Sequence, residues 1–394
     1  MNAQVVVSRG EDPYQITRIA LQQIPLPDLR GRRVLIKPNA GRVAFPGQGV
    51  TTHPSVVEAT IDDLREKGAT ELTVGESCIF GIKAEEAFRV TGMKEVSGRK
   101  AIALLDLDSF DPTEIAIAQG KVIQKVRVSS IFKKFDFIVS IPVMKTHMHT
   151  QVTLSIKNMK GLLWRRDKAR LHQLQCEPEI TRGQRELDIA ISDMASVLFP
   201  DLAVIDATVG MEGMGPAYGK VKRMGMIVAG RNPLSTDAVA ARLMGLDPAE
   251  VPHLRLAAGR KLAAATKGLG EIDPQKLSIK PDDYLKWESP FEPPPSRLSI
   301  PFPDVTVHDE GSCSACLSTL LVFVQNYYGR LSHGRLQDGK IHLGIGKHLK
   351  LTPKGTILIG NCTSKMKKGG VFIQGCPPVA SEIWNTLTQN RKSK

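Results

Sequence analysis

Short apolar segments alternate with longer segments of helical periodicity along the first 287 residues, and this alternation constrains the fold most strongly. We predict strands at Arg33–Lys37, Glu71–Gly75 and Phe135–Val143, the last of which is continuously apolar, as in a buried strand. Helical spacing of apolar residues occurs at Pro54–Lys67 and Ser235–Met244. Strands that alternate with crossover helices predict an α/β fold built on a mainly parallel, doubly wound sheet.

Further segments of the same region extend this pattern. Leu202–Asp206 and Met224–Val228 are predicted strands, and Leu187–Leu198 is a predicted helix. Thr52 is the predicted N-cap of the first helix named above, because its hydroxyl can accept a hydrogen bond from a first-turn amide. Gly210–Gly219 holds too many glycines for the interior of a helix or strand, so we predict a loop there.

A proline-rich stretch at Glu288–Pro303 divides the chain. Because proline fixes φ and removes a backbone donor, this stretch cannot continue a helix or a central strand. We predict an N-terminal domain over 1–287, a linker over 288–304 and a smaller C-terminal α/β domain over 305–394. The predicted elements of the last domain are helices at Ala315–Tyr328 and Val379–Gln389 and strands at Thr356–Gly360 and Val371–Gln374.

The composition places the chain among ordinary globular proteins. Hydrophobic residues make up 42% and charged residues 24% of its 394 residues, which excludes wholesale disorder. Its apolar runs are far shorter than the roughly 20 residues of a membrane-spanning helix. The first ten residues lack the basic start and apolar core of a signal peptide. We therefore expect a soluble, cytoplasmic protein.

The formal charge of +13 is compatible with three kinds of partner: nucleic acid, an anionic membrane surface or an anionic small molecule. Aromatic residues make up only 5% of the chain, which is low for a protein that stacks on single-stranded bases. The prediction therefore favours an anionic small molecule over nucleic acid.

Four of the six cysteines fall in the last quarter of the chain, at Cys313, Cys316, Cys362 and Cys376. In a reducing compartment such a group indicates a metal or redox site. Thiolates suit zinc or an iron–sulfur cluster, and four of them match either a structural zinc site or a 4Fe–4S cluster. Only the first pair is closely spaced, whereas structural zinc sites usually present two close pairs, so the residues favour iron–sulfur over zinc or no metal.

The order of these motifs carries a resemblance. C-x-x-C before an apolar helix, then GNC, then GCPP before a second helix resembles the small subunit of nickel–iron hydrogenases and the related cluster-bearing subunit of respiratory complex I. The resemblance covers about Asp309–Thr388, with shorter intervals than are usual in that family. It implies that the four cysteines hold a 4Fe–4S cluster at one edge of a flavodoxin-like sheet, as an electron relay. Identity as a hydrogenase subunit does not follow.

Polar residues follow the predicted strands of the first region. Lys37, Glu76, Lys145 and Asp206 each lie at the carboxyl end of a strand, and Lys157 lies in the following SIKNMKG segment. Ligands of open α/β sheets bind outside the carboxyl ends of the strands. Three lysines that converge there would form a pocket for a carboxylate or phosphate.

Plainer interpretations of the same residues stay open. Lys37 and Lys145 are also compatible with ordinary strand-end lysines, and His53 with a residue that only bonds the backbone. His147 and His149 share one face of a strand-like segment and are compatible with metal binding, but the sequence offers no third spaced ligand. The chain lacks the Rossmann and Walker glycine patterns and the Gly-x-Ser-x-Gly elbow, which disfavours those kinds of nucleotide binding and hydrolysis.

These segments also carry a resemblance as an ordered set. VLIKPN, TTHP, KTH, IKNMKG, MEGMGP and STDAVAARLMGLDP resemble the family known as domain of unknown function 362 over roughly Arg33–Pro248. Many members have an attached ferredoxin-type segment, which this chain replaces with the hydrogenase-like pattern. The positions that the resemblance implies are Lys37, Asn39, His53, Lys145, His147, Lys157, Asn158, Glu212 and Asp237. Glu76 stands where the family often has aspartate.

Taken together, the sequence predicts an iron–sulfur redox protein, an oxidoreductase or electron-transfer protein that acts with an anionic small molecule and a redox partner protein. Lys37, Lys145 and Lys157 are the expected anion clamps. Lys145, His147 and Glu76 are the candidate catalytic residues, with His147 or Glu76 as proton donor or acceptor. We expect Lys145, His147 or Lys157 to lie near the cysteines.

Two alternatives of other classes remain: a non-redox lyase or transferase with a structural cluster or zinc, and a basic nucleic-acid-binding redox sensor. The sequence makes no prediction about a flavin.

Overall fold

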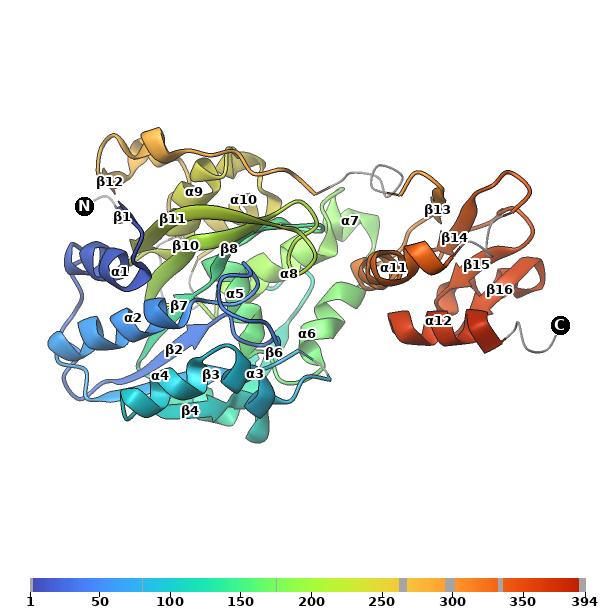
Figure 1. The fold of residues 1–394 in the computed structure, drawn as a ribbon. Coiled ribbons are helices and arrows are strands. Elements are labelled where there is room, and N and C mark those ends of the chain that lie inside the picture. The colour runs from blue at the N-terminus through green and yellow to red at the C-terminus, as the bar shows by residue number, and fades with distance from the viewer. Residues whose placement is uncertain are drawn as a thin grey trace. The chain divides into compact units, whose positions relative to one another are not determined.

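The computed structural model describes residues 3–79, 81–174, 176–261, 268–294, 302–331 and 336–389. The chain divides into two compact units. Unit 1 comprises Met1–Leu171 and Cys176–Pro294, and unit 2 comprises His172–Gln175 and Pro295–Lys394. Figure 1 shows both units. No helix of the described ranges is long and apolar enough to cross a membrane.

A ten-stranded sheet forms the centre of unit 1 in the described residues. Its main path runs in the order β12 (Ser278–Lys280), β1 (Gln4–Arg9), β11 (Lys220–Gly230), β10 (Leu202–Glu212), β7 (Phe137–Ile141), β2 (Arg33–Pro38), β3 (Glu71–Glu76) and β4 (Ala103–Asp106). β8 (Val143–His147) pairs with β10, and β9 (Gln151–Thr153) pairs with β8. β11 is antiparallel to both β1 and β10, and β9 to β8, whereas the other pairs are parallel. The predicted α/β class with a mainly parallel sheet is confirmed.

Helices cover both faces of this sheet (Figure 1). The helices of unit 1 are α1 (Pro13–Gln22), α2 (Pro54–Glu66), α3 (Ala84–Val90), α4 (Met93–Arg99), α5 (Ser155–Asn158), α6 (Asp167–Arg170), α7 (Pro178–Thr181), α8 (Glu186–Ala195), α9 (Pro233–Leu243) and α10 (Pro252–Ala258). Apolar residues of α1, α2 and α4 pack with Val34 and Ile36 of β2 in one buried cluster. α5 and α9 contact β10, and α8 and α10 pack beside them on the other face. A separate hairpin joins β5 (Pro112–Ala116) and β6 (Lys125–Ser129).

Three local predictions in unit 1 are wrong. The N-cap of α2 is His53, whose Nδ1 accepts the Ser55 amide, and Thr52 instead bonds across to the backbone of β7. Phe135–Val143 is not one strand, because Pro142 separates β7 from β8.

Gly210–Gly219 is not all loop, since its first residues complete β10. Gly210 is needed there for close packing, because a Cβ on it would lie 2.7 Å from the Met144 carbonyl oxygen.

The first residues of the predicted linker belong to unit 1. Phe291 is buried, and its N–H donates to the Met244 carbonyl at 2.9 Å. The Glu292 carbonyl accepts the Gly213 N–H at 2.8 Å. Residues 288–294 therefore pack as an irregular strap instead of running free. Residues 295–301 of the predicted linker lie outside the described residues.

Unit 2 is a small α/β unit. Its described strands form a four-stranded parallel sheet in the order β13 (Val305–Asp309), β14 (Ile341–Ile345), β15 (Thr356–Ile359) and β16 (Gly370–Ile373). The helices α11 (Ser314–Tyr327) and α12 (Ala380–Gln389) pack together, with Tyr327 stacked on Trp384. Because the strands are parallel, the segments that follow β13, β15 and β16 leave the same edge of the sheet.

Candidate functional site

A buried ion pair lies at the carboxyl ends of β2 and β3. Lys37 Nζ is 2.9 Å from both carboxylate oxygens of Glu76, and each side chain is almost fully buried. Asn158 joins them: its Oδ1 accepts from Lys37 Nζ at 3.3 Å, and its Nδ2 donates to the Lys37 carbonyl. Glu76 also accepts the backbone N–H groups of Ala40 and Ser77. The sequence predicted three of these positions separately, and the structure brings them together.

Gly161 closes over this pair. A Cβ at Gly161 would lie 2.6 Å from Lys37 Nζ and 2.7 Å from Glu76 Oε1, so a side chain does not fit there. Burial lowers the pKa of Lys37, and the Glu76 carboxylate opposes that shift. With its hydrogen bonds all made inside the protein, Glu76 acts here as a structural partner of Lys37. This arrangement does not support the expected proton-transfer role of Glu76.

A second group consists of four basic side chains, two of which are buried lysines without an ion-pair partner among the described residues. Lys145 is 1% exposed, and its Nζ donates to the Val50 carbonyl at 2.7 Å. Lys157 is also buried, with a single long contact to Thr153 Oγ1 at 3.4 Å. Neither lysine forms an ion pair with any described residue. Arg42 and Lys160 complete this group, which we call the lysine cluster (Arg42, Lys145, Lys157, Lys160).

The members of the lysine cluster act on one another electrostatically. Burial lowers the pKa of Lys145 to about 7, and the charge of Arg42 lowers it further. The pKa of Lys160 is lowered to about 7 by burial and by Arg42. Burial and the nearby Lys160 hold the pKa of Lys157 well below its ordinary value. Sequence reasoning missed Arg42 and Lys160, although Lys160 stands in the same SIKNMKG segment as Lys157.

Two aspartates fix the surrounding backbone. Asp237 of α9 accepts the Ser155 amide at 2.7 Å, the Ser155 hydroxyl at 2.5 Å and the Ile156 amide at 2.9 Å, which anchors the first turn of α5. Burial raises the pKa of Asp237 to about 7. Asp206 accepts the His53 amide at 2.7 Å and both the amide and the hydroxyl of Thr208. Asp237 and His53 therefore position the site and are not free to bind a substrate with these groups.

The other predicted residues lie in varied settings. His147 is buried at the end of β8, where its Nδ1 accepts the His149 amide at 3.1 Å. Asn39 is half-buried just beyond β2. Glu212 pairs with Lys222 at 3.0 Å and accepts the Glu292 amide, which links the end of β10 to β11 and to the strap. Glu212 thus makes structural contacts with its neighbours.

The four clustered cysteines follow the strands of unit 2. Cys313 and Cys316 lie at the start of α11, Cys362 lies in the 3-10 helix Asn361–Gly369 that follows β15, and Cys376 lies on the loop after β16. The segments after β15 and β16 are joined by hydrogen bonds, from Asn361 N to the Gly375 carbonyl at 2.8 Å and from Gly375 N to Asn361 Oδ1 at 2.9 Å. A Cβ at Gly360 would lie 3.1 Å from Cys316 Sγ, so the segment after β15 also touches the start of α11.

The thiols differ in exposure and charge. Cys316 is buried, whereas Cys362 and Cys376 are exposed. A hydrogen bond with Cys316, helped by backbone amides at the start of α11, lowers the pKa of Cys313 to about 6. The pKa of Cys316 is raised, first by that hydrogen bond and then by burial and the charges of the other three cysteines. Within the described ranges, no three His, Cys, Asp or Glu side chains are grouped closely enough, as they stand, to hold a metal ion.

Comparison with known proteins gives a family for unit 1. The model of the family described as Domain of unknown function (DUF362) matches residues 34–242. The thylakoid-associated protein sll1697 of Synechocystis sp. is 26% identical over 230 residues, which are 57% of this chain and 66% of the relative, so the match spans just under two thirds of the relative's length. The lactate racemase apoprotein of Thermoanaerobacterium thermosaccharolyticum is 12% identical with a TM-score of 0.43, and the match covers 61% of this chain and 57% of that one.

Proposed function

The chain belongs to the family described as Domain of unknown function (DUF362), and from this premise we propose that it is an iron–sulfur redox protein acting on an anionic small molecule. In this proposal unit 1 binds the anion at the lysine cluster, and unit 2 binds a 4Fe–4S cluster through Cys313, Cys316, Cys362 and Cys376. The single observation that carries the anion-binding half is the pair Lys145 and Lys157, both buried and both without an ion-pair partner among the described residues.

Buried charges are costly unless something neutralises them. Glu76 neutralises Lys37, but Lys145 and Lys157 have no such neighbour within ion-pair distance in the described structure. A carboxylate or phosphate at this position would supply the missing negative charge and accept the free ammonium hydrogens. Lys145 lies within β8, and β8 follows the carboxyl end of β7, the side of the sheet on which α/β proteins bind their ligands. An anionic small molecule is therefore the ligand class that the lysine cluster favours.

The cysteines supply the second half of the proposal. Four thiols on three segments leave one edge of a parallel sheet, and thiolates are the usual ligands of a 4Fe–4S cluster. Their number and kind fit that group, and the side chains of Cys362 and Cys376 are exposed and open to a bound cluster. A bound 4Fe–4S cluster would supply one-electron transfer. The protein's own part would be to hold the cluster through these cysteines and to hold the substrate through the lysines.

A proton-transfer role falls most naturally to Lys145. Its pKa near 7 means that it can take up or release a proton at physiological pH, which an ordinary lysine cannot do. His147, two residues further along β8, is the other candidate. Glu76 is committed to Lys37 and is not a proton donor in this proposal.

The test is a metal and sulfide analysis of protein purified without oxygen. We expect about four iron and four acid-labile sulfide per chain, with a visible absorbance that dithionite bleaches. One equivalent of zinc without sulfide would instead support a structural zinc site and a non-redox enzyme. Anion binding is tested separately by calorimetry with succinate, comparing the natural protein with Lys145→Met, which should not bind it.

A further inference from the structure

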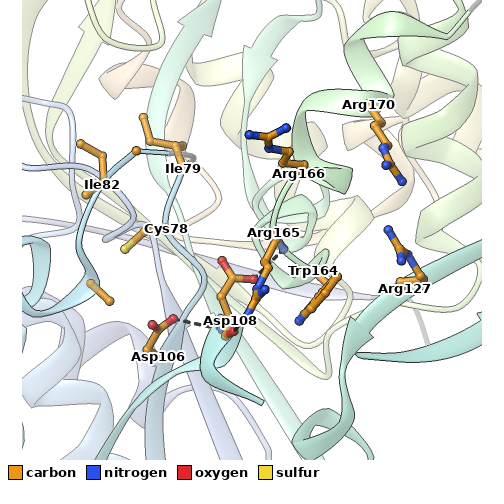
Figure 2. A pocket seen from close by; sticks show the side chains of 12 residues that line it. Cys78, Ile79, Ile82, Asp106, Asp108, Arg127, Trp164, Arg165, Arg166 and Arg170 are labelled. Atoms are coloured by element: carbon orange, nitrogen blue, oxygen red, sulfur yellow. Dashed lines mark hydrogen bonds between the residues drawn. The ribbon is translucent and has the colours of Figure 1, made fainter. Parts of the chain in front are cut away.

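A second basic site lies in unit 1, apart from the lysine cluster and unused by the proposed function. A cavity of about 430 Å³ opens beyond the carboxyl ends of β3 and β4. Its lining includes Arg127, Arg165, Arg166, Arg170, Trp164 and Asp106, and we call it the arginine pocket (Figure 2). Its size is within the range of small-molecule sites. We propose that the arginine pocket binds a hydroxylated organic phosphate of the size of a sugar phosphate.

The charge of the pocket favours an anion. Four guanidinium groups line it together with the carboxylates of Asp106 and Asp108, and Asp167 lies beside two of the four. Asp167 pairs with Arg127, through contacts of 2.7 and 2.8 Å, and with Arg170 at 3.0 Å. The side chains of Arg165 and Arg166 are exposed at the rim. Guanidinium groups bind phosphate oxygens in pairs, which makes phosphate the favoured head group.

Trp164 holds two of these guanidinium groups in place. The Arg165 Cζ lies 4.5 Å and the Arg127 Cζ 5.2 Å from the centroid of the Trp164 ring, and Figure 2 shows Trp164 between them. The indole Nε1 donates to the Phe110 carbonyl at 3.1 Å, which fixes the ring. Stacking on an aromatic face orients an arginine and reduces the conformational entropy that it loses on binding. Trp164 is therefore a positioning residue of this pocket.

The residues opposite the arginines indicate which groups the ligand carries besides its phosphate. Ile79 and Ile82 provide apolar surface, and Cys78 is held as a neutral thiol because burial raises its pKa to about 12. Asp106 Oδ1 accepts the Asp108 amide, whereas its Oδ2 has no hydrogen-bond partner among the described residues. A free carboxylate oxygen repels a phosphate but accepts a hydroxyl hydrogen. The ligand should thus place its phosphate at the arginine rim and a hydroxyl at Asp106.

Binding of ribose 5-phosphate, inorganic phosphate and succinate to the full chain tests the proposal by calorimetry, with Trp fluorescence as a second readout. We expect ribose 5-phosphate to bind at least tenfold more tightly than inorganic phosphate, because only it reaches Asp106. The double variant Arg165→Gln/Arg166→Gln should lose at least tenfold in affinity for it. Arg32→Gln is the matched control, since Arg32 is exposed just before β2, at the amino ends of the strands.

Three outcomes would overturn the proposal. For the binding that the double arginine variant weakens, equal affinity for ribose 5-phosphate and inorganic phosphate would remove the role of Asp106. Tighter binding of succinate that the same variant weakens would make this a dicarboxylate site. Loss of binding in Lys145→Met, with retention in the double arginine variant, would assign the phosphate to the lysine cluster. The arginine-pocket result and the test of the proposed function can thus fail independently.

Discussion

In unit 1 the charged groups of the candidate site are inside the protein and are held by hydrogen bonds to one another and to the backbone. In unit 2 the candidate ligands are four thiols, and two of them, Cys362 and Cys376, are exposed. The first arrangement is built by the folding of the core: Lys37, Asp206 and Asp237 are each less than 2% exposed. The second arrangement leaves two of its candidate ligands at the surface, where a bound group would complete it. The comparison distinguishes a preformed site from one that its ligand completes.

The largest expected effect is a loss of iron that occurs for a cysteine variant in unit 2 and not for one in unit 1. Replacing Cys376 with alanine should abolish iron binding and destabilise unit 2, because cluster binding is coupled to the folding of a small domain. Cys78→Ala is the matched control and should leave the iron content unchanged, since Cys78 lies in unit 1. Iron and sulfide analysis of both variants, purified without oxygen, is the measurement. Equal iron loss in the two would show that the ligands are misassigned.

The next effect tests whether unit 1 is preformed. Lys37→Ala should lower the free energy of unfolding by about 3–5 kcal/mol, because it leaves the Glu76 carboxylate buried without a positive charge to neutralise it. The control is Lys100→Ala, which breaks a more exposed pair with Asp62 and should cost about 0–1 kcal/mol. Urea unfolding followed by circular dichroism gives both values. Similar losses in the two variants would contradict the description of a buried, mutually dependent pair.

The dependence on pH gives a further test of unit 1, because the free energy of unfolding and the affinity for an anion should change in opposite directions as pH rises. The pKa of Lys145 is about 7 in the folded protein and 10.5 ordinarily, so the folded state binds fewer protons between these values and unfolding free energy rises with pH there. Anion affinity should instead fall as pH rises through 7, by at most about tenfold per pH unit for each proton involved. Lys145→Met should reduce the slope of both profiles, and Lys160, whose pKa is also about 7, should account for part of what is left. Calorimetric titration with succinate, which carries a constant charge above pH 7, would reject the prediction if affinity rose with pH.

The smallest effects concern two neighbours at the start of α2. Thr52→Ala should cost about 1–3 kcal/mol, because Thr52 is buried and its hydroxyl bonds the Ile141 carbonyl and the Asn39 amide. His53→Ala should cost about 1 kcal/mol or less, the usual loss of an N-cap acceptor. Thermal unfolding of the two variants gives the order. A larger loss for His53 would mean that capping outweighs the link between β2 and β7.

The sequence predicted the elements of unit 1 well where local signals agree with packing. Continuous apolar runs and helical spacing located β2, β3, α2 and α9, because the apolar residues whose spacing forms the pattern are the residues that become buried in the core. It was wrong at Thr52 and Gly210–Gly219, where distant contacts decide. The Thr52 hydroxyl has a better partner in β7, and glycines that suggest a loop serve close packing between β10 and β8.

The candidate site was only partly predictable for a related reason. Lys37, Glu76 and Asn158 follow from strand ends, yet nothing in the sequence shows that Glu76 neutralises Lys37 and leaves Lys145 and Lys157 uncompensated. Arg42 was missed because it lies in a loop without periodicity. The arginine pocket was missed because WRRDKAR, at residues 164–170, reads as a solvated basic segment until Trp164 and Asp167 are seen to order it.

The hydrogen bonds from the first turn of α5 to Asp237 determine the order in which parts of unit 1 can fold. A four-residue helix such as α5 is not stable alone, because the free-energy cost of nucleating a helix exceeds what so few hydrogen bonds contribute. Lys157 and Asn158 therefore reach their places only once a residue about eighty positions later has docked. During synthesis, a ribosome must release the chain through α9 before the anion site exists at all, so nascent protein passes through a long stage without binding capacity.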